Sequence, residues 1–376
     1  MKKNIFKSNG FQSLLASLLC IVLGLFLGYL VLLVINPAGA GEAILTVVKN
    51  FLTYKKTSSQ LKYLGNTLVK TAPLLMCALA ILFAYKVGLF NIGAAGQYCF
   101  GVALSLYAAL GLGWSWLPCL LVAMAGGAVL GAISGVLKSY CNVNEVISGI
   151  MLNWIVLYLT NMLLTTVKEA ASPYTIVLAN NNPSAVLPSL GLGALFNKNQ
   201  YVGLAIPLSI VMAILIWIVL DKTRFGYELK ATGFNRNAAK YCGMAEKRNV
   251  ILSLMISGAL AGMGGFVYAL TTANCSSNGD VAGFGFLALA VMIFGNWKPL
   301  NIAGASLLFG LFKCIAAAYT SLDINGDGVY LLAQIGISAH FYQMLPYLIT
   351  IIVLAFTSKS SRAPKAEGIP YDKGSR

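Results

Sequence analysis

Long apolar runs alternate with shorter polar stretches along almost the whole chain. A helix that crosses a bilayer needs about 20 mostly apolar residues, and ten runs approach or reach that length. They are Leu14–Ile35, Leu68–Tyr85, Gly93–Leu112, Leu117–Leu137, Val146–Val167, Tyr201–Leu220, Val250–Leu270, Phe284–Trp297, Ile302–Tyr319 and Phe341–Thr357. The pattern predicts an all-α, polytopic integral membrane protein with about ten transmembrane helices. Gly93–Leu112 and Phe284–Trp297 are short or glycine-rich, so we expect short or broken helices there.

The pattern also repeats loosely between the two halves of the chain. Each half has a glycine-rich, interrupted stretch, Gly88–Gly101 and Gly279–Gly295. A helix rich in small residues follows each one, around Gly126–Gly135 and Gly304–Gly310. Interrupted spans at corresponding places often mark the pathway of a membrane carrier. The sequence therefore predicts two pseudo-repeated halves around a translocation path.

The first run has two interpretations. Lysines at positions 2, 3 and 7 precede it and small residues follow it at 38–40, as in a secretory signal. Leu14–Ile35 is longer than a usual signal core, so an uncleaved spanning helix is favoured over a cleaved signal.

The remaining polar parts set the domain organisation. We expect one transmembrane domain over residues 1–357 and a disordered cytoplasmic tail from Ser358 to Arg376. Ala43–Leu52 is a candidate interfacial helix. Lys168–Gln200, with three prolines, is expected to be an irregular external segment.

Composition and charge agree with a membrane protein. Of the 376 residues, 58% are hydrophobic and only 10% charged, which is unusual for a soluble domain. Most of the 26 lysines and arginines fall in regions predicted to be cytoplasmic if both termini are inside, as the positive-inside rule requires; Lys49–Lys62 is the weak point. The net charge of +15 thus reflects topology, and no basic stripe with interleaved aromatics indicates nucleic-acid binding.

The longest polar segment between two apolar runs is Asp221–Asn249. It carries seven lysines and arginines against three acids, which places it on the cytoplasmic face. Within it, Asn235 is suited to cap a short helix, Arg236–Cys242, and Gly243 to end it in a left-handed conformation. The plain alternative is a solvated topogenic loop. We expect instead that this segment receives force from another protein, which the membrane part converts into transport.

Several kinds of chemistry find no support in the sequence. There is no GxxxxGK[ST] motif to hold ATP phosphates, the single histidine, His340, borders the last span, and the eight cysteines form no CxxC pair. No catalytic constellation or metal site is predicted, so a membrane enzyme is disfavoured. Acids are scarce within the spans, which disfavours an ion-coupled secondary transporter or channel, the main alternative class.

One further stretch resembles the start of a calcium-binding loop. Asp323–Gly328 has the alternating Asp/Asn spacing of an EF-hand, but Gln334 stands where such a loop needs a bidentate Glu. An ordinary turn is favoured, with a weak external calcium site as the alternative.

Six polar residues lie in or at the ends of the spans and are candidates to line a translocation path. They are Asn91, Gln97, Asn144, Glu145, Asn153 and Lys313. Glu145 sits at a predicted helix start, where the helix dipole favours its charge. Asn91 and Gln97 are also suited to satisfy backbone groups freed by a break in the helix. Packing between helices through small residues remains the alternative for these stretches.

Four stretches in order from about Leu64 to Phe312 resemble the permeases of bacterial ABC importers for branched-chain amino acids and simple sugars. They are Gly88–Gln97 (GLFNIGAAGQ), Asn144–Ile147 (NEVI) with Met151–Trp154 (MLNW), Phe225–Gly243, and Gly283–Gly295. The NEVI, MLN and FNIGAAGQ forms are most similar to the nucleoside-type branch. Ala95 departs from the family, which commonly has Glu there.

The resemblance implies the transmembrane permease subunit of an ATP-driven importer in the bacterial cytoplasmic membrane, for nucleosides first, with simple sugars and then branched-chain amino acids as alternatives. It implies a partner ATPase that binds ATP and magnesium, a second homologous permease and an external lipid-anchored binding protein. It also implies that the segment 221–249 couples to the ATPase. The candidate residues for this coupling are Phe225, Gly226, Glu228, Lys230, Gly233, Asn235, Arg236, Ala238, Ala239 and Gly243.

Overall fold

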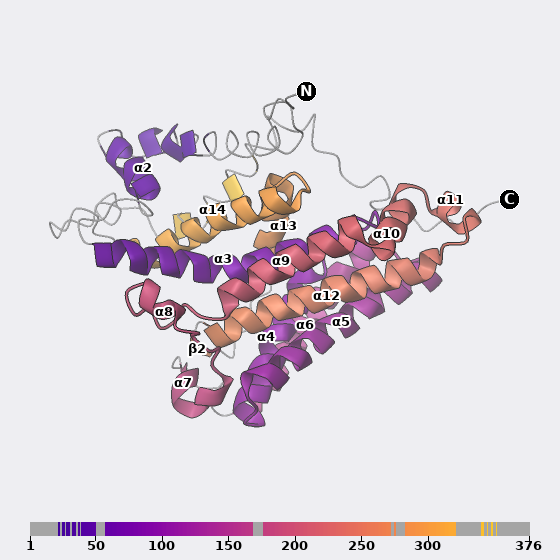
Figure 1. The fold of residues 1–376 in the computed structure, drawn as a ribbon, viewed down its shortest axis with the longest axis horizontal. Coiled ribbons are helices and arrows are strands. Elements are labelled where there is room, and N and C mark those ends of the chain that lie inside the picture. Colours follow the sequence, from indigo (N-terminus) through magenta and orange to yellow (C-terminus); the bar gives the residue numbers. More distant parts are fainter. Residues whose placement is uncertain are drawn as a thin grey trace. The chain divides into compact units, whose positions relative to one another are not determined.

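The structure is a computed structural model of the chain. It describes residues 39–49, 57–167, 176–271, 274–275 and 283–320, with isolated positions between 22 and 37 and between 340 and 351 (Figure 1). More than half of the predicted first span and of the predicted last span lies outside the described residues, and the cytoplasmic tail and the turn at 323–328 lie wholly outside them.

The described part is helical apart from one two-residue strand pair, and seven of its helical segments are long and apolar enough to cross a membrane. These are α3 (Thr57–Tyr85), α4 (Ala94–Leu106) continued by the π-helical turn η2 (Tyr107–Gly111), α5 (Trp116–Tyr140), α6 (Glu145–Thr165), α9 (Ala205–Lys222), α12 (Glu246–Thr271) and α14 (Pro299–Ala318). An eighth apolar helix, α13 (Phe284–Phe294), is shorter. All eight coincide with predicted spans, which confirms a polytopic membrane protein.

The other elements are short. They are α2 (Ala40–Lys49), β1 (Ile176–Val177), α7 (Leu178–Asn181), η3 (Pro183–Ala185), α8 (Leu192–Leu195), α10 (Arg224–Phe234), α11 (Arg236–Tyr241) and β2 (Asn274–Cys275). The strands pair antiparallel, with Ile176 opposite Cys275. The helix α2 lies where an interfacial helix was predicted. Both predicted interrupted spans hold a short helix, α4 or α13, followed by a longer one, α5 or α14.

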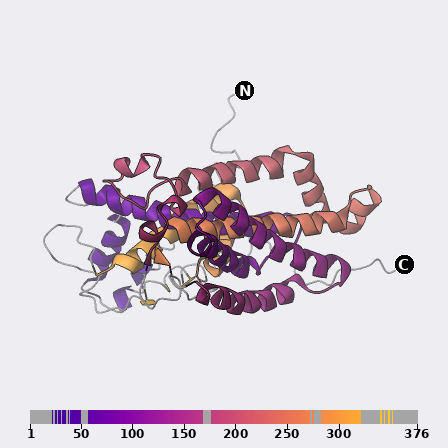
Figure 2. The same cartoon turned by 90° about the horizontal axis from the view of Figure 1, so that it is seen from below.

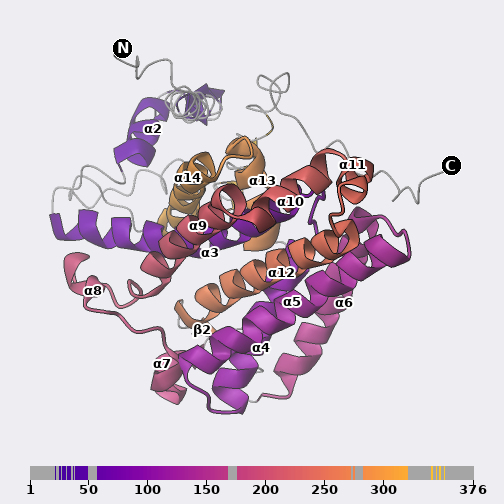
Figure 3. The same ribbon diagram turned by 45° about the vertical axis from the view of Figure 1, so that its right-hand side comes forward.

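The chain divides into two compact units, each built from separated stretches. Unit 1 comprises residues 1–71, 189–203 and 290–362, and unit 2 comprises residues 72–188, 204–289 and 363–376. In unit 2, α12 packs along α5 and α4 (Figures 1 and 3). Its apolar side chains Met263, Phe266 and Leu270 are buried in the main hydrophobic cluster of that unit.

The α5–α12 contact depends on glycine. A Cβ atom on Gly127 would collide with the carbonyl oxygen of Gly258, and one on Gly258 would collide with the carbonyl oxygen of Gly127. The two backbones touch because neither residue has a side chain, the usual way that membrane helices pack closely. The small-residue stretch predicted around Gly126–Gly135 therefore lies at a helix–helix contact.

Two helices of unit 2 expose most of their apolar surface. Only 28% of the apolar window of α6 and 22% of that of α9 is buried. Trp154 and Tyr158 of α6 and Ile214 and Trp217 of α9 are among the exposed side chains. Such surface suits lipid or another membrane protein.

Unit 1 has its own contacts. The Asn199 amide donates to the side-chain oxygen of Asn66 at 2.8 Å and to the carbonyl of Lys62 at 3.2 Å, which ties the segment after α8 to the start of α3. Phe294 and Phe309 meet edge to face, with ring centroids 5.7 Å apart, which joins α13 to α14.

Candidate functional site

The basic segment 221–249 folds into two helices between the long apolar helices α9 and α12. Figure 2 shows it at one end of that pair, in the rose to salmon part of the colour scale. The Thr223 hydroxyl caps α10 by accepting from the Gly226 amide at 3.1 Å. The Asn235 side chain caps α11 by accepting from the Ala238 amide at 3.0 Å. The segment is thus well-formed structure and not an irregular loop.

The predicted short helix is confirmed in its main features. It was expected over Arg236–Cys242 and is observed over Arg236–Tyr241, with Asn235 as its cap. Gly243 follows with a φ of 78°, the left-handed conformation expected of it. The helix α10 was not predicted, although Thr223 at its start is a typical N-cap residue.

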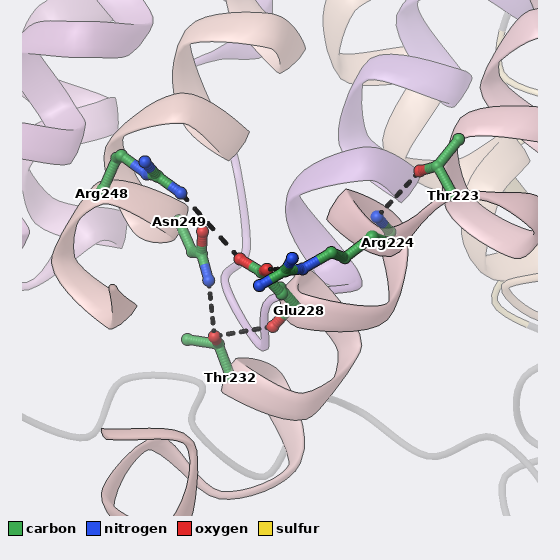
Figure 4. Close-up of polar contacts among 7 residues, drawn as sticks. Thr223, Arg224, Glu228, Thr232, Arg248 and Asn249 are labelled. Carbon is green, nitrogen blue, oxygen red and sulfur yellow. Dashed lines mark hydrogen bonds and ion pairs between the residues drawn. The ribbon is translucent and has the colours of Figure 1, made fainter. Parts of the chain in front are cut away.

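Glu228 joins α10 to the start of α12 (Figure 4). Its carboxylate accepts from Arg224 Nε at 3.0 Å and lies 4.0 Å from Arg248 Nη2. The Arg224 side chain is 92% exposed, so its pair with Glu228 contributes little stability. The Arg248 contact links two helices, α10 and α12.

A buried contact reinforces that link. The Asn249 side-chain amide donates to the Thr232 hydroxyl at 3.1 Å, and both residues are fully buried. The Thr232 hydroxyl in turn donates to the carbonyl of Glu228 at 2.7 Å. Because hydrogen bonds shielded from water are costly to break, α10 and the start of α12 are expected to move together.

The end of α10 rests on the turn that follows α3. A Cβ atom on Gly233 would lie 2.5 Å from the carbonyl oxygen of Lys86 and 2.8 Å from the carbonyl carbon of Val87. Only glycine fits at this distance, so Gly233 sets how closely α10 approaches the broken stretch that begins at Gly88.

Lys86, on that turn, has a lowered pKa. Burial is the largest cause, the nearby positive charge of Lys230 lowers the pKa further, and Asp221 opposes the shift. Lys230 and Asp221 themselves form a half-exposed ion pair. The turn after α3 thus lies within the electrostatic reach of the basic segment.

Some of the candidate coupling residues are buried within the segment, and others lie on its surface. Gly226 and Ala239 are buried and Phe225, Glu228, Lys230, Gly233 and Arg236 partly buried, whereas Asn235, Ala238 and Gly243 are exposed. Three exposed aromatic side chains were not among the predicted site residues: Tyr227 (65% exposed), Phe234 (83%) and Tyr241 (90%). The sequence does show aromatic residues within a polar segment. They could have been named as candidates, because such side chains often anchor protein contacts.

Three of the predicted path residues come together around the broken stretch that begins at Gly88. Asn91 donates to the side-chain oxygen of Gln97 and to the Ser257 hydroxyl, each at 2.8 Å. Asn153 accepts from the Gly96 amide at 2.8 Å and donates to the carbonyl of Ile92 at 3.1 Å. All three candidates are at most 3% exposed. The side chain that satisfies the freed backbone groups is therefore Asn153, while Asn91 and Gln97 bond to each other.

The other path candidates lie elsewhere. Asn144 caps α6 by accepting from the Val146 amide at 2.8 Å, and Glu145 is the first residue of that helix, as expected. Glu145 also forms an ion pair with Lys138 at 2.6 Å, a partner that sequence reasoning missed. Lys313 lies on α14 in unit 1 and is partly buried. That any of the six lines a path stays a prediction.

Within the described residues no group of three or more His, Cys, Asp or Glu side chains is placed to hold a metal ion. Cys77, Cys99, Cys119 and Cys314 are buried and form no disulfide within the described part of the chain.

Known proteins resemble the chain over most of its length. The family model for the branched-chain amino acid transport system / permease component matches residues 63–354. The guanosine ABC transporter permease protein NupQ of Bacillus subtilis is 32% identical over 82% of this chain and 96% of its own. Two proteins of Lactococcus lactis are named nucleoside ABC transporter permease proteins: NupB is 30% identical over 96% and 99% of the two chains, and NupC 34% identical over 82% and 96%.

The family model covers well over half of the chain, and the relatives cover 82–96% of it. Together with the multi-pass helical fold, this identifies the chain as a member of the family of permease components of branched-chain amino acid transport systems.

Proposed function

We propose that the chain is the membrane-spanning permease subunit of an ATP-driven importer of nucleosides. The observation that carries the solute class is the set of relatives named as nucleoside or guanosine permeases, at 30–34% identity over 82–96% of this chain. Simple sugars and then branched-chain amino acids are the alternatives, the latter on the family description.

In this proposal the basic segment 221–249 is the surface on which a partner ATPase docks. Its capped helices, the bond from Asn249 to Thr232 and the close fit of Gly233 support this role, because a docking element must move as a body to transmit force. ATP and magnesium would be held by the partner. Closure of the ATPase would push α11, and α10 would carry the displacement toward α12 and the turn after α3.

The distribution of positive charge indicates how the chain is oriented in the membrane. The basic segment and both termini lie on the cytoplasmic side, as the positive-inside rule favours. The solute arrives from an external lipid-anchored binding protein that selects it. Few ionisable groups lie within the described spans, which supports selection outside the membrane and not in the permease.

A second, homologous permease completes the assembly. Two relatives of this chain, NupB and NupC, come from the same Lactococcus strain, which supports pairing of two different permeases. The exposed apolar faces of α6 and α9 offer surface for lipid or for such a partner. The solute would pass between the two permeases, with Asn91, Gln97, Asn144, Glu145, Asn153 and Lys313 as the candidate polar groups of this subunit.

Uptake measurements test the solute class. The chain is expressed together with an ATPase, a second permease and a binding protein from the same genome in a strain that lacks nucleoside uptake. Radiolabelled guanosine, uridine, ribose and leucine are then supplied separately. Uptake of the nucleosides that requires a working ATPase supports the proposal, whereas uptake of ribose or leucine alone would replace it with the corresponding alternative.

A further inference from the structure

Three polar residues of α12 lie in one line. Asn249, Ser253 and Ser257 are spaced four apart, so they share one stripe of the helix. Each is 0% exposed. A stripe of this kind inside a membrane protein needs hydrogen-bond partners, because unsatisfied polar groups are costly away from water.

Both ends of the stripe have partners. At the cytoplasmic end, Asn249 donates to Thr232 of α10 (Figure 4). Two turns further along, the Ser257 hydroxyl donates to the carbonyl of Ala80 in α3 at 2.6 Å and accepts from Asn91 at 2.8 Å. The stripe therefore begins at the basic segment and ends at the Asn91–Gln97 pair of the broken stretch.

The middle of the stripe is unsatisfied by protein groups. Within the described part of the chain, neither the side-chain oxygen of Asn249 nor the hydroxyl of Ser253 has a hydrogen-bond partner. Side chains four apart on a helix have Cβ atoms about 5–6 Å from each other, a span that one water molecule can bridge. Buried water in proteins typically occupies such polar sites.

We propose that ordered water molecules bridge Asn249 to Ser253 and Ser253 to Ser257, and that they complete a continuous polar seam, which runs from Thr232 through Asn249, Ser253 and Ser257 to Asn91 and Gln97. The ligand of this site is water. The seam makes Ser253 a positioning residue: it joins the displacement of α10 to the hydrogen bonds that hold the broken stretch. This inference rests on the coupling role proposed above for segment 221–249.

A polar seam suits transmission better than an apolar contact does. A hydrogen-bonded chain has discrete arrangements, so a shift of Thr232 either preserves the chain or breaks it. The seam also explains why three buried polar side chains occupy positions where leucine or alanine would need no partner.

The test compares Ser253→Ala with Ser105→Ala. Ser105 is equally buried in α4 but its hydroxyl bonds to the carbonyl of Gly101 in its own helix, so it is a matched control outside the seam. Ser253→Thr keeps the hydroxyl and serves as the rescue variant. Each variant is purified with its ATPase and sister permease. Thermal unfolding is measured in detergent, and guanosine uptake per ATP hydrolysed is measured in liposomes with the binding protein.

The seam predicts that Ser253→Ala lowers the unfolding midpoint by about 2–4 °C. It also predicts that guanosine moved per ATP hydrolysed falls at least about fivefold, while Ser105→Ala and Ser253→Thr leave this ratio near that of the unmodified protein. A Ser253→Ala protein as stable as the parent overturns the bridging water. An unchanged ratio overturns the transmission. If the unmodified complex hydrolyses ATP without moving guanosine, the solute assignment fails, and the unfolding comparison still decides the water site.

Discussion

The Nζ atom of Lys138 and a carboxylate oxygen of Glu145 lie 2.6 Å apart, and neither side chain is more than 1% exposed. The pair closes the turn between α5 and α6, where Lys138 is in the last turn of one helix and Glu145 is the first residue of the next. A charge buried to this degree is tolerated because its partner is present. Glu145 is thus first a structural residue, whatever it contributes to a path.

Removal of one partner should therefore destabilise the protein strongly. Glu145→Leu removes the carboxylate that pairs with Lys138, and the loss of one member of a buried ion pair typically costs about 3–5 kcal/mol. Replacement of both, as Lys138→Met with Glu145→Leu, should recover most of that loss, because apolar residues of similar volume need no partner. Chemical unfolding in detergent measures both. A single variant as stable as the parent would mean that the pair is open to water.

Enlargement of Gly233 should separate ATP hydrolysis from uptake. A side chain there collides with the backbone of the turn at Lys86 and Val87, so Gly233→Val moves α10 off the broken stretch while membrane insertion continues. We expect normal amounts of protein in the membrane and at least a tenfold loss of uptake, roughly the effect of about 1.4 kcal/mol of lost coupling. Ala239→Leu, at the buried position of α11, should act in the same way.

Gly304→Ala is the control for this substitution. Gly304 lies inside α14, and a Cβ atom there meets nothing within 4 Å, so alanine should be neutral or stabilise the helix by roughly 0.5–1 kcal/mol. Equal uptake by the Gly233→Val protein and the Gly304→Ala protein would count against the coupling role of α10.

Loss of the aromatic ring of Tyr241 should weaken assembly without a loss of stability. The side chain is 90% exposed, so its removal changes little within the chain. Buried in a partner's groove, an aromatic anchor of this kind is typically worth 1–2 kcal/mol or more, so Tyr241→Ala should weaken ATPase binding about tenfold. Tyr158→Ala, 69% exposed on α6, is the control away from the segment. Co-purification at graded ATPase concentrations measures the difference, and identical binding by the two variants contradicts the prediction.

Lys86 should give the stability of the protein a pH dependence in the alkaline range. Burial lowers its pKa in the folded chain, so the unfolded chain binds more protons between that pKa and the unfolded value of about 10.4. Stability should therefore rise with pH in this window, and the cost of the buried charge is present in full below it. Lys86→Gln should flatten the rise, and Asp221→Asn, which removes the opposing charge, should steepen it.

Unfolding midpoints from about pH 8 to pH 10.5 measure this slope. Lys86→Arg keeps its charge throughout the range and should also be flat, but less stable than Lys86→Gln. An unchanged slope in the Lys86→Gln protein would assign the pH dependence to other groups.

The sequence predicted the membrane helices well because long apolar runs follow from the thickness of the bilayer. It also predicted α11, because Asn235 and Gly243 signal a helix start and end by purely local physics. The length of α13 agrees with the expectation of a short or broken span at 284–297.

Contacts between distant residues were beyond the sequence. Nothing near Lys138 shows that it is buried against Glu145 and not in a solvated turn, because this depends on how α5 and α6 pack. The role of Asn153 in satisfying Gly96 and Ile92 likewise requires knowledge of which helix covers the break. The prediction for the basic segment rested on its charged residues, so it did not include the exposed rings of Phe234 and Tyr241.

The interlocking of Gly127 with Gly258 limits how unit 2 can change shape. The carbonyl oxygen of each glycine occupies the space that a side chain on the other would fill. The two helices therefore cannot slide past one another without separating first. We therefore expect α5 and α12 to swing as a single lever during each cycle. The bending then has to occur in the short connections that link these two helices to the rest of the chain.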